Sequence, residues 1–260
     1  MKYCTLLSKK CIRLLFSGLV LILASMLSLT SFAEHQHKGE ASKSAKRVNQ
    51  SHCHGVDVKC AKTVTSAFAP NGDLWRLWVM GKGLYAQVSV DNGQHFFAVK
   101  KIDIAAENIS ARNENRPKIA FDNYGGVYLS WAMPREKKYT ADIRFSYSAD
   151  YGKTFTQPVT VNNDNLLAGH SFNEMLLTGE GDISLVWLDA RLSHQLRQQG
   201  KKTKGSALFL GQANYLKGET TFSNQQLANN TCVCCRIAMT TNRDDELAIF
   251  WRHIYGDNIR

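Results

Sequence analysis

The stretch Ser148-Ala149-Asp150-Tyr151-Gly152-Lys153-Thr154-Phe155 separates two runs in which apolar and polar residues alternate. Because such alternation is typical of half-buried β-strands, the stretch between the runs is predicted to be a hairpin turn. The Ser and Asp side chains can hydrogen-bond nearby backbone, and Gly152 can adopt a positive φ. Phe155 can pack the turn onto the sheet beneath it. The stretch is therefore predicted to close a β-hairpin.

A second copy of this turn lies upstream, at residues 89–96. The copies share four positions, which are Ser89, Asp91, Gly93 and Phe96 in the first and Ser148, Asp150, Gly152 and Phe155 in the second. Two copies 59 residues apart indicate a structural repeat.

Four hairpins that end in tryptophan repeat along the same part of the chain. They occupy residues 67–78, 119–131, 175–187 and 237–251, and their tryptophans are 53, 56 and 64 residues apart. A period near 50 to 60 residues, with about four strands in each unit, is what a β-propeller requires. We therefore predict an all-β fold, a β-propeller of four-stranded blades. We expect the strand that ends in tryptophan to be the innermost of its blade, and we expect no amphipathic helix.

The sequence contains three complete units and the first hairpin of a fourth, about three and a half blades. Propellers close roughly four to eight blades into a ring, and an open arc would leave strand edges uncovered. We therefore expect the chain to be a fragment of a longer protein.

The N-terminus has the features of a secretory signal. Four basic residues precede an apolar run from Leu14 to Leu29, and Ser31-Phe32-Ala33 suits a signal peptidase. We predict a signal peptide at 1–33, a polar disordered linker at 34–50 and a partial propeller at 51–260, in a periplasmic or secreted protein. If the leader stays uncleaved, it is the only membrane anchor that we expect.

Charge places limits on the partners. The whole chain carries +10, and removing the four cations of the leader leaves 28 basic and 22 acidic residues, or +6. The basic runs at 38–47 and 197–204 contain no aromatic residues, so we expect a solvated tail and a long loop and no nucleic-acid partner.

The two turns resemble the Asp boxes, or bacterial neuraminidase (BNR) repeats, of the sialidase superfamily. Cys232-x-Cys234-Cys235-Arg236, followed by Trp251-Arg252-His253, is similar to exported bacterial sialidase-like proteins. The resemblance implies a six-bladed propeller and a site in which three arginines hold a sugar carboxylate, with an Asp acid/base and a Tyr nucleophile. The family's Arg-Ile-Pro motif is absent, and Arg116-Pro117-Lys118-Ile119 is only a loose echo of it.

The best candidate site follows the predicted inner strands of the third and fourth units. Asp189 is the candidate catalytic acid, and Arg191, Arg236 and Arg252 are candidates to bind an acidic sugar, because guanidinium groups pair with carboxylates and sulfates. In the alternative interpretation, Asp189 and Arg191 pair with each other and stabilise a blade junction.

Five cysteines remain after the leader is removed, and they are Cys53, Cys60, Cys232, Cys234 and Cys235. An oxidising compartment favours disulfides among them, with connectivity left open. A copper or zinc site is the less favoured alternative, and no other cofactor is expected.

Two functions follow from these patterns. The first is a sialidase-like enzyme, an exo-α-sialidase or another glycan-directed glycosidase, that acts on a glycan or another acidic ligand. The alternative is a non-catalytic propeller that serves in binding or assembly and uses the cysteine cluster for disulfides or metal. Fold alone does not choose between them.

Overall fold

The computed structural model describes residues 55–112, 114–178, 181–215 and 221–256. The chain divides into two compact units, residues 1–48 and 49–260, and the described residues all belong to the second. The predicted signal peptide and linker therefore lie outside the described residues. In the described part of the chain, no helix is long and apolar enough to cross a membrane.

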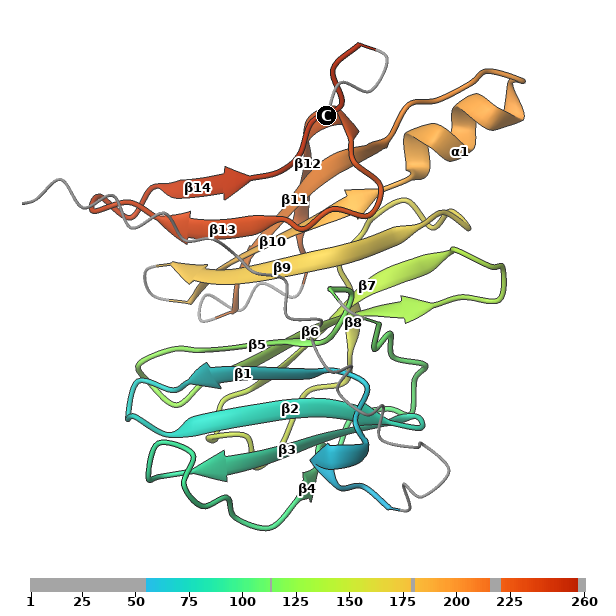
Figure 1. Ribbon diagram of the computed structural model, residues 1–260. Coiled ribbons are helices and arrows are strands. Elements are labelled where there is room, and N and C mark those ends of the chain that lie inside the picture. Colours follow the sequence, from blue (N-terminus) through green and yellow to red (C-terminus); the bar gives the residue numbers. More distant parts are fainter. Residues whose placement is uncertain (1–54, 113, 179–180, 216–220, 257–260) are drawn as a thin grey trace, which may run out of the picture. The chain divides into compact units, whose positions relative to one another are not determined.

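The second unit is built from antiparallel sheets that follow one another along the chain (Figure 1). Three sheets have four strands in sequence order, and one hairpin follows them, which confirms the predicted propeller blades. Blade 1 contains β1 (Val64–Phe68), β2 (Leu74–Met80), β3 (Gly83–Ser89) and β4 (Lys100–Lys101), after the short 3-10 helix η2 (Val58–Cys60). Blade 2 contains β5 (Lys118–Phe121), β6 (Val127–Pro134), β7 (Ala141–Ser148) and β8 (Val159–Thr160). Blade 3 contains β9 (His170–Thr178), β10 (Asp182–Asp189), β11 (Ser206–Asn214) and β12 (Ser223–Thr231), and the last hairpin is β13 (Ala238–Thr241) with β14 (Leu247–Phe250).

The innermost strand of each blade is its first strand. β1 contacts β5, β5 contacts β9, and β9 contacts β13, so these four strands follow one another from blade to blade. The expectation that the strands leading to the repeated tryptophans are innermost is therefore wrong, because these strands, β2, β6, β10 and β14, are the second strands of their sheets. Both strands of each hairpin carry apolar residues. The sequence therefore indicates that the two strands pair, but it does not indicate which of them is nearer the propeller axis.

The hydrophobic core lies between the blades. Blades 1 and 2 share a cluster around Trp131, blades 2 and 3 share one around Phe145 and Trp187, and blade 3 and the last hairpin share one around Leu208 and Ile237. Trp78, Trp131 and Trp187 are 0% exposed, whereas Trp251 is 39% exposed. Truncating a buried aromatic side chain of this size typically costs about 3–5 kcal/mol.

Both Asp boxes connect the third strand of a blade to the fourth. In the second box, Ser148 Oγ accepts a hydrogen bond from the Gly152 amide (2.8 Å) and donates one to Asp150 Oδ1 (2.7 Å). Asp150 accepts hydrogen bonds from the hydroxyl (2.6 Å) and the amide (2.9 Å) of Thr154. These bonds to Thr154 lower the pKa of Asp150. Gly152 has a φ of 73°, as a tight turn of this kind requires.

The first box has the same geometry, with His95 in the place of the Thr. Ser89 Oγ donates to Asp91 Oδ1 (2.7 Å), and the His95 amide donates to the same oxygen (2.8 Å). The His95 ring Nδ1 lies 2.7 Å from Asp91 Oδ2. The His95 amide, with the Ser89 hydroxyl and the His95 ring, lowers the pKa of Asp91 to about 2. The His95 ring nitrogen thus takes the place that the Thr154 hydroxyl has in the second box.

The second Asp box also packs against blade 1. A Cβ atom at Gly152 would lie 2.9 Å from the Trp75 ring, so only glycine fits there. Lys100 Nζ, from β4, donates to the Gly152 carbonyl at 2.7 Å. Phe155 packs against the cluster that blades 1 and 2 share. This turn of blade 2 is therefore part of the contact between the two blades.

The segment after β10 differs from the predicted loop. It begins with an α-helix, α1 (Arg191–Gln198), of which only Ser193 is buried. Ser193 Oγ donates to the Gly205 carbonyl (3.1 Å), which ties the helix to the chain that leads into β11. The helix was missed because it has no N-terminal capping side chain and only two apolar residues, Leu192 and Leu196, one turn apart.

Candidate functional site

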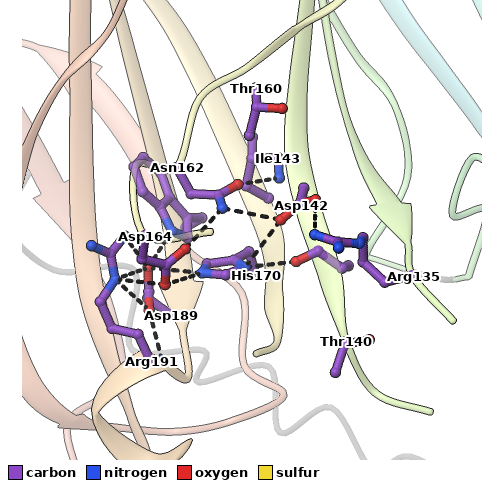
Figure 2. Close-up of polar contacts among 12 residues, drawn as sticks. Arg135, Thr140, Asp142, Ile143, Thr160, Asn162, Asp164, His170, Asp189 and Arg191 are labelled. Carbon is purple, nitrogen blue, oxygen red and sulfur yellow. Dashed lines mark hydrogen bonds and ion pairs between the residues drawn. The ribbon is translucent and has the colours of Figure 1, made fainter. Parts of the chain in front are cut away.

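The predicted site residues separate into two places. Asp189 and Arg191 lie at the end of β10 and the start of α1, in a polar network between blades 2 and 3 (Figure 2). Arg236 and Arg252 lie next to the last hairpin and line an open pocket. The structure therefore does not bring all four residues into one site.

Asp189 is 0% exposed, and both of its oxygens have hydrogen-bond partners. Oδ2 accepts from the Trp187 indole (2.8 Å) and from Arg191 Nη2 (2.9 Å), while Oδ1 accepts from the Arg191 amide (2.9 Å). Arg191 also approaches Asp164 Oδ2 (3.2 Å) and stacks over the Phe209 ring at 4.0 Å. These contacts favour the blade-junction interpretation of the Asp189–Arg191 pair.

His170 lies at the centre of the same network and is 0% exposed. Its Nδ1 donates to the Ala141 carbonyl (2.6 Å), and its Nε2 lies 3.0 Å from Asp164 Oδ2 and 3.5 Å from Asp189 Oδ2. Both ring nitrogens therefore face acceptors, which a doubly protonated imidazole satisfies. Burial lowers the pKa of His170, but the hydrogen bond to Asp164, with the charges of Asp189 and Asp164, outweighs burial and raises it.

The network continues across blade 2. Asn162 Nδ2 donates to Asp142 Oδ1 and to Asp164 Oδ1, each at 3.1 Å, and Arg135 Nη1 donates to Asp142 Oδ2 at 2.8 Å. Three cations therefore face three carboxylates when His170 is protonated, so their charges sum to zero. The cations are Arg135, His170 and Arg191, and the carboxylates are Asp142, Asp164 and Asp189. A balanced cluster of this kind is suited to joining two blades.

The open pocket is lined from the inner strands and has a volume of about 520 Å³. Six of its lining residues are charged, and they are Glu114, Arg116, Lys118, Glu174, Arg236 and Arg252. Lys118 begins β5, Glu174 lies in β9, and Arg236 comes two residues before β13. Four cations and two carboxylates give the lining a net charge of +2. Phe250 (62% exposed) and Trp251 (39%) supply apolar surface.

Both carboxylates of the pocket form ion pairs. Lys118 Nζ lies 2.5 Å from Glu174 Oε1, with both side chains largely buried. Arg236 holds Glu114 through two contacts, Nε to Oε2 (2.5 Å) and Nη2 to Oε1 (2.6 Å). The hydrogen bond from Arg236 lowers the pKa of Glu114. Two of the four cations are thereby neutralised within the pocket.

The other two cations, Arg116 and Arg252, form no ion pair with any carboxylate of the described residues. Arg116 Nε is buried and has no hydrogen-bond partner among them. Arg252 Nη1 has a weak contact with Cys235 Sγ, at 3.8 Å. An unpaired guanidinium beside a pocket attracts an anion, because it offers several donors in a planar array.

Sequence reasoning missed Glu114 and Glu174 and gave Arg116 and Lys118 no role in a site. One signal was present in the repeat. Arg116 and Arg236 both stand two residues before the first strand of a unit, so they occupy equivalent positions in two successive units. Such equivalence predicts that the two side chains lie at the same end of neighbouring inner strands.

The prediction of disulfides is confirmed for Cys232 and Cys235, which are bonded to each other. Cys60 is also disulfide-bonded, and Cys53 lies outside the described residues. Cys234 is exposed and is a free thiol. The Sγ atoms of Cys232, Cys234 and Cys235 lie within 4.8 Å of one another. Copper or zinc would need these sulfurs as thiolates, so the oxidised pair does not fit a metal ion.

Successive four-stranded antiparallel blades, with Asp boxes at the same turn of blades 1 and 2, confirm the predicted architecture. The chain has the fold of a β-propeller built from four-stranded blades. No protein-family model matches the sequence, and no curated protein matches it.

Several solved structures are similar to part of this chain at low sequence identity. A protein of unknown function from Dyadobacter fermentans matches with a TM-score of 0.50 and 13% identity, over 71% of this chain and 54% of that one. A GH93 α-L-arabinofuranosidase from Fusarium graminearum, in complex with arabinobiose, gives 0.49 and 15%, over 76% and 57%. The NanB sialidase from Streptococcus pneumoniae gives 0.43 and 12%, over 69% and 25%. The chain thus spans little more than half the length of the first two.

Proposed function

We propose that this sialidase-like propeller is glycan-directed and that the pocket at β5, β9 and β13 binds the acidic group of a glycan. The observation that carries the proposal is the pair of unpaired guanidinium groups, Arg116 and Arg252, in a pocket whose other two cations are already neutralised. A carboxylate or sulfate on a sugar would neutralise one of the two excess positive charges of the pocket. The exposed faces of Phe250 and Trp251 can pack against a sugar ring.

We also propose that the protein is periplasmic or secreted. The basic and apolar leader favours export, and the Cys232–Cys235 disulfide is typical of an oxidising compartment.

Hydrolysis is the second candidate function, because Glu114 and Glu174 place two carboxylates in one pocket. Glycoside hydrolysis usually requires one carboxyl group to donate a proton. Arg236 lowers the pKa of Glu114, and Lys118 forms an ion pair with Glu174. The two glutamates are therefore better suited to charge balance than to proton donation. Binding is therefore the function that the described residues support best. Asp189 remains a catalytic hypothesis only if the blade junction opens.

Calorimetric titration of the full-length protein tests binding. We expect 3′-sialyllactose and a sulfated uronic-acid disaccharide to bind, and the neutral sugar lactose to bind at least about tenfold more weakly. Arg116→Gln and Arg252→Gln should each weaken acidic-sugar binding about tenfold or more. Arg243→Gln is the matched control, because Arg243 is exposed at the turn of the last hairpin and does not line the pocket. Equal binding of acidic and neutral sugars would refute the proposal.

Fluorogenic sialoside and uronide substrates separate the two candidates. Turnover that Glu174→Gln abolishes would establish a glycosidase. Acidic-sugar binding without turnover would establish a binding protein.

A further inference from the structure

We propose that Cys232, Cys234 and Cys235 form a thiol–disulfide exchange site that oxidises a dithiol of a peptide or protein. The three residues lie in the link between β12 and β13. Neither glycan binding nor glycan hydrolysis uses these cysteines, and Arg252 is the residue that the proposal shares with the pocket.

The site combines an accessible disulfide with a neighbouring thiol. Cys232 and Cys235 are partly buried and bonded across three residues, whereas Cys234 between them is exposed and free. The three sulfurs lie within 4.8 Å of one another, so each is close enough for exchange after a small movement. Val233 is 56% exposed in the same link and offers an apolar contact to a peptide.

The backbone around the cysteines is anchored, so the sulfurs are presented from an ordered link. The Cys232 amide donates to the Arg252 carbonyl (2.9 Å), and the Ile254 amide donates to the Asn230 carbonyl (2.7 Å). A β-bridge between Thr231 and His253 lies between these two bonds. The anchoring segment also carries Arg252, whose Nη1 lies 3.8 Å from Cys235 Sγ.

Arg252 gives the two disulfide sulfurs different reactivities. A nearby cation favours a thiolate, and a thiol with a lower pKa leaves faster in exchange. Cys235, which has the guanidinium beside it, is therefore the leaving sulfur, and Cys232 is the sulfur that an incoming thiolate attacks.

The reaction proceeds in two exchanges. A thiolate of the incoming dithiol bonds to Cys232 Sγ, and the electron pair of the Cys232–Cys235 bond goes to Cys235. The second thiolate of the dithiol then attacks its partner sulfur, which forms the dithiol's own disulfide and releases Cys232 as a thiolate. The dithiol loses two electrons and two protons, and the Cys232–Cys235 disulfide gains the two electrons.

Cys234 acts on the mixed disulfide. Its thiolate can attack Cys232 Sγ, form a Cys232–Cys234 bond and expel the incoming thiolate. This step needs no further reactant. It releases an incoming thiol that has no second thiol with which to form its own disulfide.

The test uses the oxidised full-length protein and a synthetic peptide with two cysteines separated by two residues. After alkylation, mass spectrometry should show about one peptide disulfide formed for each chain, together with free Cys232 and Cys235. The disulfide at Cys60 is the internal control and should stay oxidised under the same conditions. The proposal is refuted if the peptide stays reduced, or if Cys60 is reduced as fast as Cys235.

Variants test the assigned roles. Cys232→Ser with Cys235→Ser should abolish peptide oxidation, and thermal unfolding of this variant checks that it is folded. With a peptide that has one cysteine, Cys234→Ser should slow release of the peptide from Cys232, because only the Cys235 thiolate remains to attack the mixed disulfide. Arg252→Gln should slow the first exchange about tenfold, whereas Arg243→Gln should leave it unchanged. An unchanged rate in Arg252→Gln would overturn the assignment of Cys235 as the leaving sulfur.

Discussion

Two clusters of arginines and carboxylates lie in this propeller, and they differ in what surrounds them. The network at Asp189 is buried between blades 2 and 3, and its three carboxylates face three cations when His170 is protonated (Figure 2). The pocket at Arg236 is open, and it holds two more cations than carboxylates. Arginines and carboxylates therefore join two blades in the buried network, whereas in the open pocket they leave cations that can bind an anion. The two clusters differ in burial and in charge balance, and they contain the same types of residue.

The largest expected effect comes from breaking the buried network at its most enclosed carboxylate. Asp189→Asn leaves Arg191 and protonated His170 without a full counter-charge, and removing one partner of a buried ion pair typically costs about 3–5 kcal/mol. We expect the melting temperature to fall by about 6–20 °C. Differential scanning calorimetry measures this shift, with the exposed Asp244→Asn as the control. A shift as small as that of the control would mean that the network does not stabilise the blade junction.

The next effect depends on pH and comes from His170. Its pKa is raised in the folded protein above the usual value of 6.5, so its contribution is fully present below pH 6.5 and is lost as the pH rises through the raised value. His170→Gln should lower the unfolding free energy by about 1–3 kcal/mol at pH 6, and by less at higher pH. Urea unfolding across pH 5 to 9 measures the difference between variant and wild type. A difference that does not change with pH would mean that folding does not raise the pKa of His170.

A smaller loss is expected in acid, from Asp164. Burial raises the pKa of this carboxyl, but the hydrogen bond and charge of His170, with Arg191 and Asn162, outweigh burial and lower it to about 2 from 3.8. Its contribution is present above pH 3.8 and is lost as the pH falls toward 2. With allowance for solvent screening, the loss is about 1–2 kcal/mol. Comparing wild type with Asp164→Asn over pH 2 to 5 should show the two stability curves converging at the acid end.

The smallest effect on stability is expected in the open pocket. Glu114→Gln removes the partner of Arg236, whose side chain is 69% exposed, so water can take over the lost contacts and the melting temperature should stay close to that of wild type. The variant frees a third cation, and binding of 3′-sialyllactose should strengthen several-fold. Differential scanning calorimetry measures the melting temperature, and titration calorimetry at two salt concentrations measures the affinity for 3′-sialyllactose. Weaker binding in this variant would mean that Glu114 itself contacts the sugar.

The Asp boxes and the hairpins could be predicted from the sequence because both depend on local chemistry. Ser148, Asp150 and Gly152 hydrogen-bond within one turn, so their spacing is sufficient to identify it. The position of Asp189 could not be predicted, because it depends on which strand of a hairpin faces the axis. The sequence shows the pairing of β9 with β10 but does not distinguish the inner strand from its neighbour.

The pocket was predicted in part. Arg236 and Arg252 were selected as residues beside strand ends, and the structure places both in one pocket. Glu114 and Glu174 were missed, because one precedes its strand by four residues and the other lies inside β9, where no local motif marks it. Their partners come from segments that are 122 and 56 residues away in sequence.

The contact of Gly152 with Trp75 has a consequence for how the blades unfold. Blade 2 supplies the turn, and blade 1 supplies the ring and the Lys100 ammonium that holds the turn's carbonyl. Opening either blade therefore exposes apolar surface of the other, so the two should lose amide protection together in hydrogen exchange, as one cooperative unit. The turn at Gly152 closes a hairpin of blade 2, and through its contacts with blade 1 it makes the two blades together the unit that we expect to open.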